Sequence, residues 1–294
     1  MNGVIARTLP DGRLHLQHGP IEVLVECWGG RVEIDAAYEQ ARRRFASILG
    51  ELVEELPCLR QPVGEIYPLL RSPAARRMAA AVWPCRDVFI TPMAAVAGAV
   101  ADELMESLLK DRGLRKACVN DGGDIALYLA PGEDINVGIV EDIARPAITA
   151  TANVGFRSPV RGVATSGWRG RSQSLGIADA VSVLAHNAAA ADAAATLIAN
   201  AVNIDHPSIE RRPARQVKED SDLGDLPVTV AVGALSTGEK NVALANGLAV
   251  ARRMQVRGLI HAAYLALQGT SAVVPAADTL KLCQPPASIR SPAP

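Results

Sequence analysis

The stretch from Gly162 to Asn203 constrains the fold of this chain more than any other, because small residues dominate it. It contains a Thr-Ser-Gly turn, an apolar strand and an alanine-rich helix. Small side chains let neighbouring backbones approach closely, so the composition of the stretch predicts a buried packing segment. Hydroxyl and carboxylate groups are nevertheless spaced along it, and their oxygens can bind a cation or a phosphate. The placement of these polar residues therefore also indicates a site.

The overall composition indicates a globular protein whose core lacks large aromatic side chains. Of its 294 residues, 49% are hydrophobic but only 3% are aromatic. The core must therefore come from Ala, Val, Leu and Ile, which suits helices laid closely on sheets. Lysine and arginine number 30 against 31 acidic residues, giving a net charge of −1. This balance gives no excess of positive charge that would attract nucleic acid or an anionic membrane, so we expect neither as a partner.

The cysteines and the apolar runs bear on where the protein works. Five cysteines are widely spaced, and they form no C-x-x-C or Cys/His zinc pattern. Reduced thiols in a cytoplasmic protein are the expected consequence. The first thirty residues hold charges and no unbroken apolar region, and no run of eighteen apolar residues occurs anywhere. We therefore expect a soluble, cytoplasmic protein without a membrane span.

Predicted strands and helices alternate irregularly along the chain. A hairpin around His18-Gly19-Pro20 precedes a helix that runs from an N-cap at Asp35 to about Leu56. Further helices are expected at 91–110, 188–202 and 238–256, and strands at 117–120, 125–129, 135–140, 147–152, 177–185, 227–233 and 257–268. Residues 205–226 are expected to form a loop or mobile connector.

This order of elements favours an α+β fold over a doubly wound parallel sheet. We expect a single large domain over residues 1–274, with the N-terminal hairpin and helix at about 12–56. The proline-rich tail, residues 275–294, is expected to be disordered.

Two adjacent glycines between two predicted strands form the first candidate motif, Asp121-Gly122-Gly123-Asp124. Paired glycines allow backbone N–H groups to approach a phosphate or a ring, and Asp124 can accept a hydrogen bond from a ribose hydroxyl or a ring N–H. The same sequence also makes a hairpin turn, and the spacing alone favours that interpretation.

Asp192 and Thr196 form the second candidate motif, because they lie one helical turn apart on the same face. Carboxylate and hydroxyl oxygens are hard ligands suited to Mg²⁺ or Ca²⁺. Alternatively, Asp192 stabilises the helix dipole and Thr196 bonds back to a carbonyl, and the spacing alone favours this second interpretation. Thr165-Ser166-Gly167 can likewise bind a phosphate or make a turn.

Taken in order, these segments resemble a known family. The stretches 119–125, 164–167 and 191–196 are similar to the N-x-G-G-D-I, T-S-G and A-D-A-x-A-T blocks of the ApbE family. Its members are FAD:protein FMN transferases, Mg²⁺-dependent enzymes that split FAD and attach FMN to a Thr or Ser of a target protein. The wider match, over about residues 10–275, resembles an uncharacterised branch of that superfamily. The resemblance implies an ApbE-like fold of layered sheets covered by helices, with a cleft lined by the Gly-Gly-Asp and Thr-Ser-Gly loops.

The resemblance also implies roles for individual residues. Asp192 and Thr196 would hold Mg²⁺, with a backbone carbonyl near Ala94 or Ala95 completing the site. A pocket for FAD or another nucleotide-like ligand would be lined by Gly122, Gly123, Asp124, Thr165, Ser166 and Gly167. In the segment 91–102, Gly98 and Asp102 match the family.

Two departures from the family pattern concern its chemistry. The lysine that the family carries before the matching glycine is Ala97 here. The block H-I-x-D-P-x-T-G should follow the Thr-Ser-Gly motif, but this chain has only residues 171–179 in its place, with no His and no Pro. A histidine that could activate a carbonyl or phosphate is therefore missing.

Two functional hypotheses follow. The first is a Mg²⁺-dependent, transferase-like enzyme acting on a flavin, a nucleotide or a related phosphorylated heterocycle, with Asp179 and Asp124 as its candidate acid and base. The second is a non-catalytic protein for heterocycle binding or assembly, which kept the cleft without flavin-transfer chemistry. The retained D-x-x-x-T pattern favours the first, and the missing Lys and His favour the second. An open sheet edge and an alanine-rich surface are compatible with a homo-oligomer, and the substrate stays open.

Overall fold

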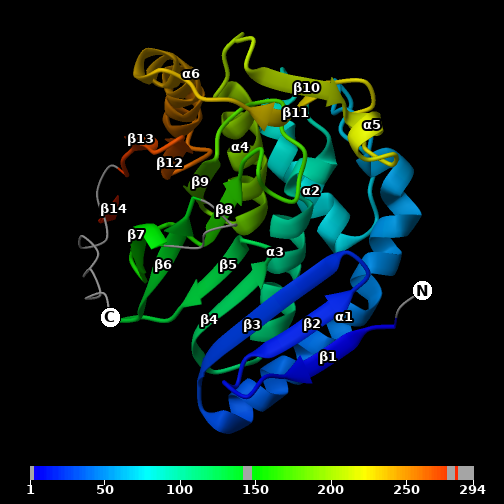
Figure 1. The fold of residues 1–294 in the computed structure, drawn as a ribbon. Helices are drawn as coiled ribbons and strands as arrows, with labels where there is room; N and C mark the ends of the chain where they lie inside the picture. Colours follow the sequence, from blue (N-terminus) through cyan, green and yellow to red (C-terminus); the bar gives the residue numbers. More distant parts are fainter. Residues whose placement is uncertain (1–2, 142–147, 277–281, 284–294) are drawn as a thin grey trace, which may run out of the picture.

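One long antiparallel sheet organises the molecule (Figure 1). In the computed structural model, which describes residues 3–141, 148–276 and 282–283, nine strands pair in the order β1-β2-β3-β4-β5-β8-β9-β12-β13. Each neighbouring pair is antiparallel. The strands are β1 (Ile5–Thr8), β2 (Leu14–His18), β3 (Ile21–Gly29), β4 (Leu114–Asp121), β5 (Asp124–Leu129), β8 (Gly162–Ser166), β9 (Ala180–Ala185), β12 (Ala262–Leu267) and β13 (Thr270–Val274).

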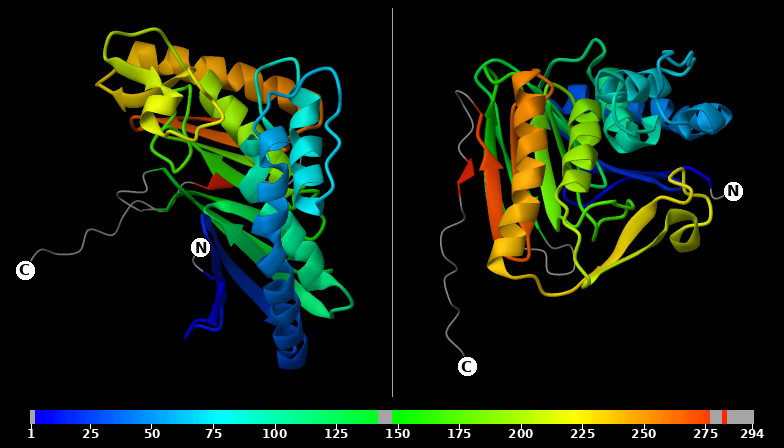
Figure 2. Two further views of the ribbon diagram at one scale, coloured as in Figure 1. Left: turned by 90° about the vertical axis from the view of Figure 1, so that its right-hand side faces the viewer. Right: turned by 90° about the horizontal axis from the view of Figure 1, so that it is seen from above.

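Helices gather on one side of this sheet (Figure 2). The main helices are α1 (Arg31–Leu59), α2 (Pro73–Val82), α3 (Val96–Leu109), α4 (Ala188–Ala201) and α6 (Thr237–Val256). A 3₁₀ turn, Pro92–Ala95, leads into α3. The largest cluster of buried apolar residues joins these helices to the sheet, and alanine, valine, leucine and isoleucine supply most of it. The expected α+β fold in a single domain is confirmed.

Two smaller sheets complete the fold. The first consists of β14 (Leu282–Cys283), β7 (Ile148–Gly155) and β6 (Asp134–Val140). Val137 and Val154 of this sheet pack with Leu127 and Leu184 of the main sheet in a second apolar cluster, so it forms a further layer. The second sheet pairs β10 (Ile209–Pro213) with β11 (Pro227–Val232), and the short helix α5 (Ala214–Val217) follows β10.

The backbone approaches α4 closely from three sides, as its alanine content predicts. A Cβ placed on Gly98 of α3 would lie 2.3 Å from the carbonyl oxygen of Ala188, and one on Gly162 of β8 would lie 2.0 Å from that of Asn187. A Cβ on Gly176 would lie 2.0 Å from the carbonyl oxygen of Ala199. Only glycine fits at these contacts, because any side chain would push α4 away from its neighbours. The small residues therefore place α4 against both α3 and the sheet.

Most of the predicted elements are present, but the structure corrects several of them. Asp35 is not the N-cap of the first helix, because α1 already begins after Gly30, whose backbone is extended. The Asp35 carboxylate instead accepts a hydrogen bond from Arg31 Nε at 2.9 Å within the helix. Residues 205–226 are not simply a connector, since they form β10 and α5.

Polar contacts hold this segment on the rest of the protein. Thr91 donates a 2.5 Å hydrogen bond to Asp222, and Arg60 pairs with Asp220 at 3.1 Å. Strands β1, β8 and β13 were not predicted, and the predicted strand from Ile177 begins only with β9 at Ala180. In the predicted disordered tail, residues 277–281 and 284–294 lie outside the described residues.

Candidate functional site

The Asp-Gly-Gly-Asp motif is a two-residue turn between β4 and β5. Asp121 and Asp124 lie directly opposite each other in the strand register, and Gly122 and Gly123 have φ values of 65° and 113°. Such positive φ values explain both glycines by the turn alone. The N–H of Gly123 donates to the side chain of Asn120 at 2.8 Å, so this amide is already satisfied. The hairpin interpretation is therefore confirmed, and a ligand-binding role of the glycines stays a prediction.

The two aspartates of the turn face the helix layer. Val119 is buried in the helix-side cluster, and Asp121 lies two residues further along the same strand, hence on the same face. Asp124 shares this face because it pairs directly with Asp121. Asp121 is only 6% exposed, whereas Asp124 is half-buried and accepts a 3.3 Å hydrogen bond from the Thr165 N–H. Both carboxyl groups thus point toward α3 and α4.

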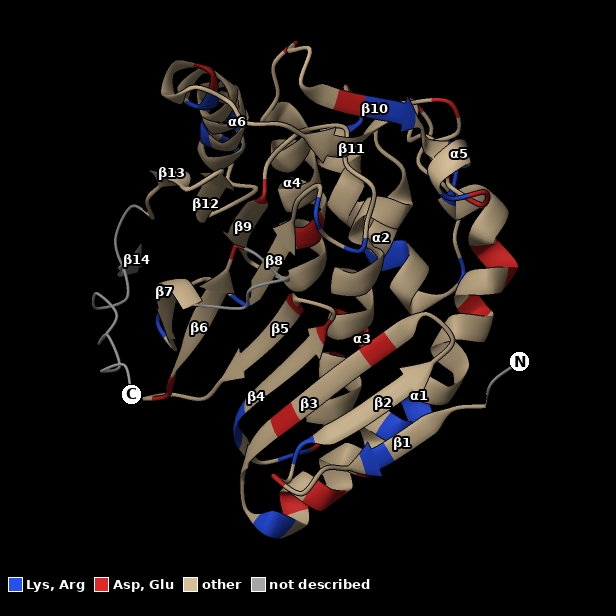
Figure 3. Cartoon of the chain, viewed as in Figure 1, with Lys and Arg blue, Asp and Glu red and all other residues tan. Residues whose placement is uncertain are grey.

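Asp192 approaches the same place from α4. Its carboxylate accepts a 3.1 Å hydrogen bond from the Gly98 N–H, in the first turn of α3. The Ala97 N–H also donates to it. Asp192 therefore does serve a helix N-terminus, but that of the neighbouring helix rather than its own. Figure 3 shows the acidic segments at the end of β4 and on α4 facing each other.

The three carboxyl groups influence each other electrostatically. Burial, reinforced by the negative charge of Asp124, raises the pKa of Asp121 to about 7. Burial and the charge of Asp192 raise the pKa of Asp124 well above its ordinary value. Burial raises the pKa of Asp192 to about 7, although the amides of Gly98 and Ala97 oppose this shift and the charge of Asp121 adds to it. Such a group of carboxylates gains stability from a proton or a cation.

Thr196 lies one turn after Asp192 on α4, as predicted, and is half-buried. Within residues 3–141, 148–276 and 282–283, its hydroxyl has no hydrogen-bond partner, so the alternative of a bond back to a carbonyl is not realised. Ala94 belongs to the 3₁₀ turn that packs against α4, and it is half-buried. These placements bring the predicted metal ligands to neighbouring elements; metal binding itself stays a prediction.

The Thr-Ser-Gly motif ends β8 beside the Asp124 side chain. Thr165 is exposed, and its hydroxyl lies 2.7 Å from that of Ser182 on β9. Gly167 follows the strand, and a Cβ there would lie 2.3 Å from the carbonyl oxygen of Asp179. Ser166 is half-buried. The motif thus borders the carboxylate group, while the hydroxyl of Thr165 already has a protein partner.

Asp179 makes structural contacts that the sequence did not indicate. Its carboxylate pairs with Arg169 Nε at 3.1 Å and accepts hydrogen bonds from Trp168 Nε1 and from the N–H of Gln268. These contacts join the loop after β8 to the turn between β12 and β13. They occupy the Asp179 oxygens, so its predicted acid or base role would require these bonds to break.

From the sequence, Trp168, Arg169 and Arg171 could form an anion-binding lip or simply be solvated, and the structure brings Arg171 near the carboxylates. Its Nη1 lies 3.4 Å from the position of a Cβ on Gly122, and its Nη2 donates to the carbonyl oxygen of Pro20 at 3.3 Å. Its positive charge lowers the pKa of Asp121, against the larger effect of burial. No sequence signal marks this proximity, because it depends on how the loop after β8 folds back over the β4–β5 turn.

Asp102, which matches the ApbE pattern, accepts hydrogen bonds at the start of α4. The N–H groups of Ala188 and Ala189 donate to its two oxygens at 3.0 and 2.9 Å. Within the described part of the chain, no cluster of three or more His, Cys, Asp or Glu side chains has the geometry of a metal site. A cation here would therefore depend on the hydroxyl and carbonyl oxygens as well as on Asp192.

Fold and site together define an α+β protein with carboxylates gathered against the N-terminus of a helix. The profile of the family described as "AbpE bacteria" matches residues 6–273. This match covers most of the chain, and the chain therefore belongs to that family. It is an ApbE-like protein of the uncharacterised branch that the sequence motifs indicated.

Relatives in methanogenic archaea support the same assignment. A UPF0280 protein from Methanosarcina barkeri is 40% identical over 126 residues, which are 41% of this chain and 47% of the relative. A UPF0280 protein from Methanocaldococcus jannaschii is 40% identical over 119 residues, 38% of this chain and 45% of the relative. The chain thus matches about half the length of these relatives, whose names state no activity.

Two solved structures align over nearly the whole chain. The apo form of the flavinyl transferase ApbE from Pseudomonas stutzeri has a TM-score of 0.41 and 14% identity, covering 92% of this chain and 94% of its own. A mutant of the flavin transferase ApbE from Vibrio cholerae has a TM-score of 0.40 and 12% identity, covering 96% of this chain and 97% of its own.

Among the described residues, no helix is both long and apolar enough to cross a membrane.

Proposed function

We propose that this protein is a Mg²⁺-dependent enzyme that acts on a flavin, a nucleotide or a related phosphorylated heterocycle. The observation that carries the proposal is the meeting of Asp121, Asp124 and Asp192, whose pKa values are all raised. When they are ionised, these neighbouring carboxylates repel a phosphate, so an anionic substrate needs a cation between them. Family membership adds support, and two of the stretches that resemble the ApbE blocks contain these residues.

The donor atoms available here fit a hard divalent cation. Asp192 offers a carboxylate and the turn at Ala94 a backbone carbonyl, while Thr196 offers a hydroxyl that has no partner among the described residues. A bound Mg²⁺ would supply charge neutralisation for a phosphate group. Asp192 would be held ready by the N–H groups of Gly98 and Ala97. Asp124 is the better placed candidate base, because it lies beside Asp192 while the oxygens of Asp179 are already occupied by Arg169, Trp168 and Gln268.

The proposal is tested by incubating the purified protein with FAD and Mg²⁺ and following the release of AMP. We expect release that EDTA stops and that Asp192→Asn and Thr196→Val reduce at least tenfold. Asp134→Asn, an exposed carboxylate on β6, serves as the matched control and should keep full activity. Wild-type protein that neither releases AMP nor shifts its melting temperature with FAD, FMN or ATP would contradict the flavin and nucleotide assignment.

A second candidate function rests on a different observation. The Gly123 amide is occupied by Asn120, Asp179 is fully bonded, and Ala97 replaces the lysine of the family. A non-catalytic protein that binds a heterocycle or takes part in assembly would show these features. Binding of FAD or FMN in a thermal shift, without AMP release at any Mg²⁺ concentration, would favour this function over the enzyme.

Two further properties belong to the proposal. We expect the protein to work in the cytoplasm, because Cys27, Cys58, Cys85 and Cys118 are free thiols. We also expect a homo-oligomer, for which the end strands β1 and β13 offer open sheet edges. Light scattering on the purified protein checks the oligomeric state, and a monomer at all concentrations would contradict it.

A further inference from the structure

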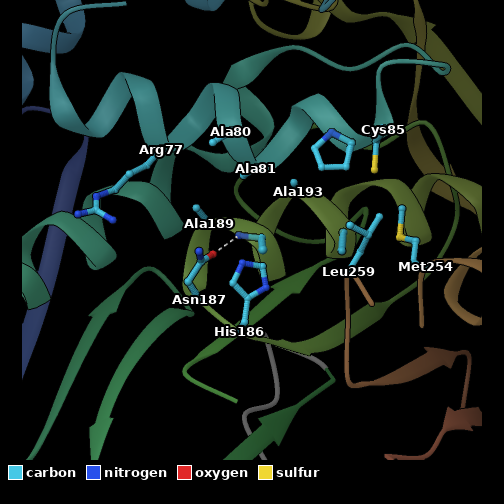
Figure 4. A pocket seen from close by; sticks show the side chains of 13 residues that line it. Arg77, Ala80, Ala81, Cys85, His186, Asn187, Ala189, Ala193, Met254 and Leu259 are labelled. Carbon is cyan, nitrogen blue, oxygen red and sulfur yellow. Dashed lines mark hydrogen bonds between the residues drawn. The ribbon is translucent and has the colours of Figure 1, made fainter. Parts of the chain in front are cut away.

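A hollow of about 200 Å³ lies between α2, α4 and α6 (Figure 4), and Asp192 is not among the residues that line it. One wall consists of four alanines of α4, Ala189, Ala190, Ala193 and Ala194, and Ala80 and Ala81 of α2 also line it. Met254 of α6 and Leu259, which follows that helix, close one end. The space exists because small side chains stand where larger apolar ones would fill it.

The other end of the hollow is polar. His186 and Asn187 precede α4, and Arg77 of α2 lies nearby. Asn187 is occupied, because its side-chain oxygen accepts from the Ala190 N–H at 2.8 Å, and Arg77 pairs with Glu103 at 3.1 Å. The imidazole of His186 is exposed and has no hydrogen-bond partner within the described ranges. It is thus available to a ligand.

A buried thiol also lines the hollow. Cys85 is 5% exposed, its sulfur faces the space in Figure 4, and the described residues provide it with no hydrogen-bond partner. Burial raises the pKa of this thiol, although the charge of Arg257 opposes the shift. Cys85 is therefore a neutral, weakly polar group that can contact an apolar molecule.

Size and chemistry together restrict what the hollow can hold. An apolar cavity of about 150 Å³ stays free of water and binds benzene. A hollow of about 200 Å³ with alanine walls accommodates one aromatic ring or a small fused pair. Its polar end adds one hydrogen-bonding position, at His186. Water cannot form hydrogen bonds with the apolar walls, whereas a planar ring would make van der Waals contacts with both helices at once.

We propose that this hollow is a binding site for a small aromatic molecule with one polar substituent. The ring lies between the alanines of α2 and α4, with Met254 and Cys85 at its edge, and the substituent bonds to His186. The site uses a different face of α4 from Asp192, and the inference does not depend on the function proposed above.

The binding test uses phenol and indole as probes, titrated into the full-length protein by calorimetry. We expect saturable binding in the wild type and about tenfold or greater loss in Ala190→Leu and Ala81→Leu, which fill the space from two helices. Ala249→Leu makes the same change on the exposed face of α6 and should bind like the wild type. His186→Ala should weaken phenol several-fold while leaving benzene unchanged.

Cys85 provides a second measurement that needs no variant. Alkylation of individual cysteines by iodoacetamide is followed by peptide mass spectrometry, with and without indole. Indole should slow the reaction of Cys85 at least threefold and leave the exposed Cys58 unaffected. Wild-type protein that binds neither probe, or that binds them without protecting Cys85, would overturn the proposal. Equal binding to well-folded Ala190→Leu and Ala81→Leu would overturn it as well.

Discussion

Asp102 and Asp192 each cap the helix to which the other belongs. Asp102 of α3 accepts from the Ala188 and Ala189 N–H groups at the start of α4, at 3.0 and 2.9 Å. Asp192 of α4 accepts from the Gly98 N–H at the start of α3, at 3.1 Å. Backbone donors at a helix start have no partner within their own helix, and a carboxylate there also stabilises the dipole. This reciprocal capping therefore fixes α3 and α4 relative to each other at the candidate site.

The first prediction concerns the cap of α4. Replacing Asp102 by Ala leaves the two buried N–H groups of Ala188 and Ala189 without an acceptor. We expect a loss of about 2–3 kcal/mol in the free energy of unfolding. Asp102→Asn keeps one acceptor oxygen and should lose less. Urea denaturation measures both variants, and an Asp102→Ala protein as stable as the wild type would show that water replaces the cap.

The second prediction concerns the contact between the two helices. A Cβ on Gly98 would lie 2.3 Å from the Ala188 carbonyl oxygen, so Gly98→Ala must separate α3 from α4. We expect a destabilisation of about 2–3 kcal/mol and weaker binding of any ligand held by Asp192. Gly50→Ala in α1 is the matched control, because no atom lies within 4 Å of its Cβ position. That variant should be stabilised by about 0.5–1 kcal/mol.

Local geometry explains which parts of the site could be predicted. The position of Asp121 opposite Asp124 follows from two short apolar runs joined by two glycines, a hairpin pattern that the register confirms. The alanine helix from Ala188 was also predicted within one residue at its end, since its composition is helical. Local patterns thus predicted the separate elements of the site.

Long-range contacts explain what could not be predicted. The hydrogen bond from Ala188 to Asp102 joins residues 86 positions apart, and that from Gly98 to Asp192 joins residues 94 apart. No periodicity encodes such a pairing, and only the family resemblance connected the motifs in advance. The contacts of Arg171 and Asp179 could not be predicted either, because the fold of the loop after β8 decides them.

The third prediction concerns a buried ionic group beside the aromatic-binding hollow. Glu103 of α3 is 7% exposed and accepts from Arg44 Nε at 2.8 Å and Arg77 Nε at 3.1 Å. Glu103→Ala would leave two guanidinium groups only partly paired, and we expect a loss of about 2 kcal/mol or more. Glu39→Ala removes the exposed pair with Arg43 and should cost at most about 0.5 kcal/mol. Thermal unfolding of both variants at one pH decides whether burial makes this difference.

The last prediction is a pH dependence of stability that a divalent cation reduces. The pKa values of Asp121 and Asp192 rise to about 7 in the folded protein, well above the ordinary value of about 3.9 for an unfolded aspartate. The folded state therefore holds protons that the unfolded state has released, and the stability they contribute is lost as the pH rises through about 7. The protons are released progressively between about pH 4 and pH 7, so the useful window is about pH 5 to 7. In the part of this window below about pH 6.5, the lowered pKa of His261 opposes some of the loss.

In that window we expect the melting temperature of EDTA-treated protein to fall by about 2–4 °C. Added Mg²⁺ should reduce the fall, because a cation replaces the lost protons among the carboxylates. Asp192→Asn removes one charge and should flatten the profile without Mg²⁺, while the exposed control Asp134→Asn should keep the wild-type slope. A profile that Mg²⁺ leaves unchanged in the wild type would argue against a cation at Asp192, even if the slope itself is present.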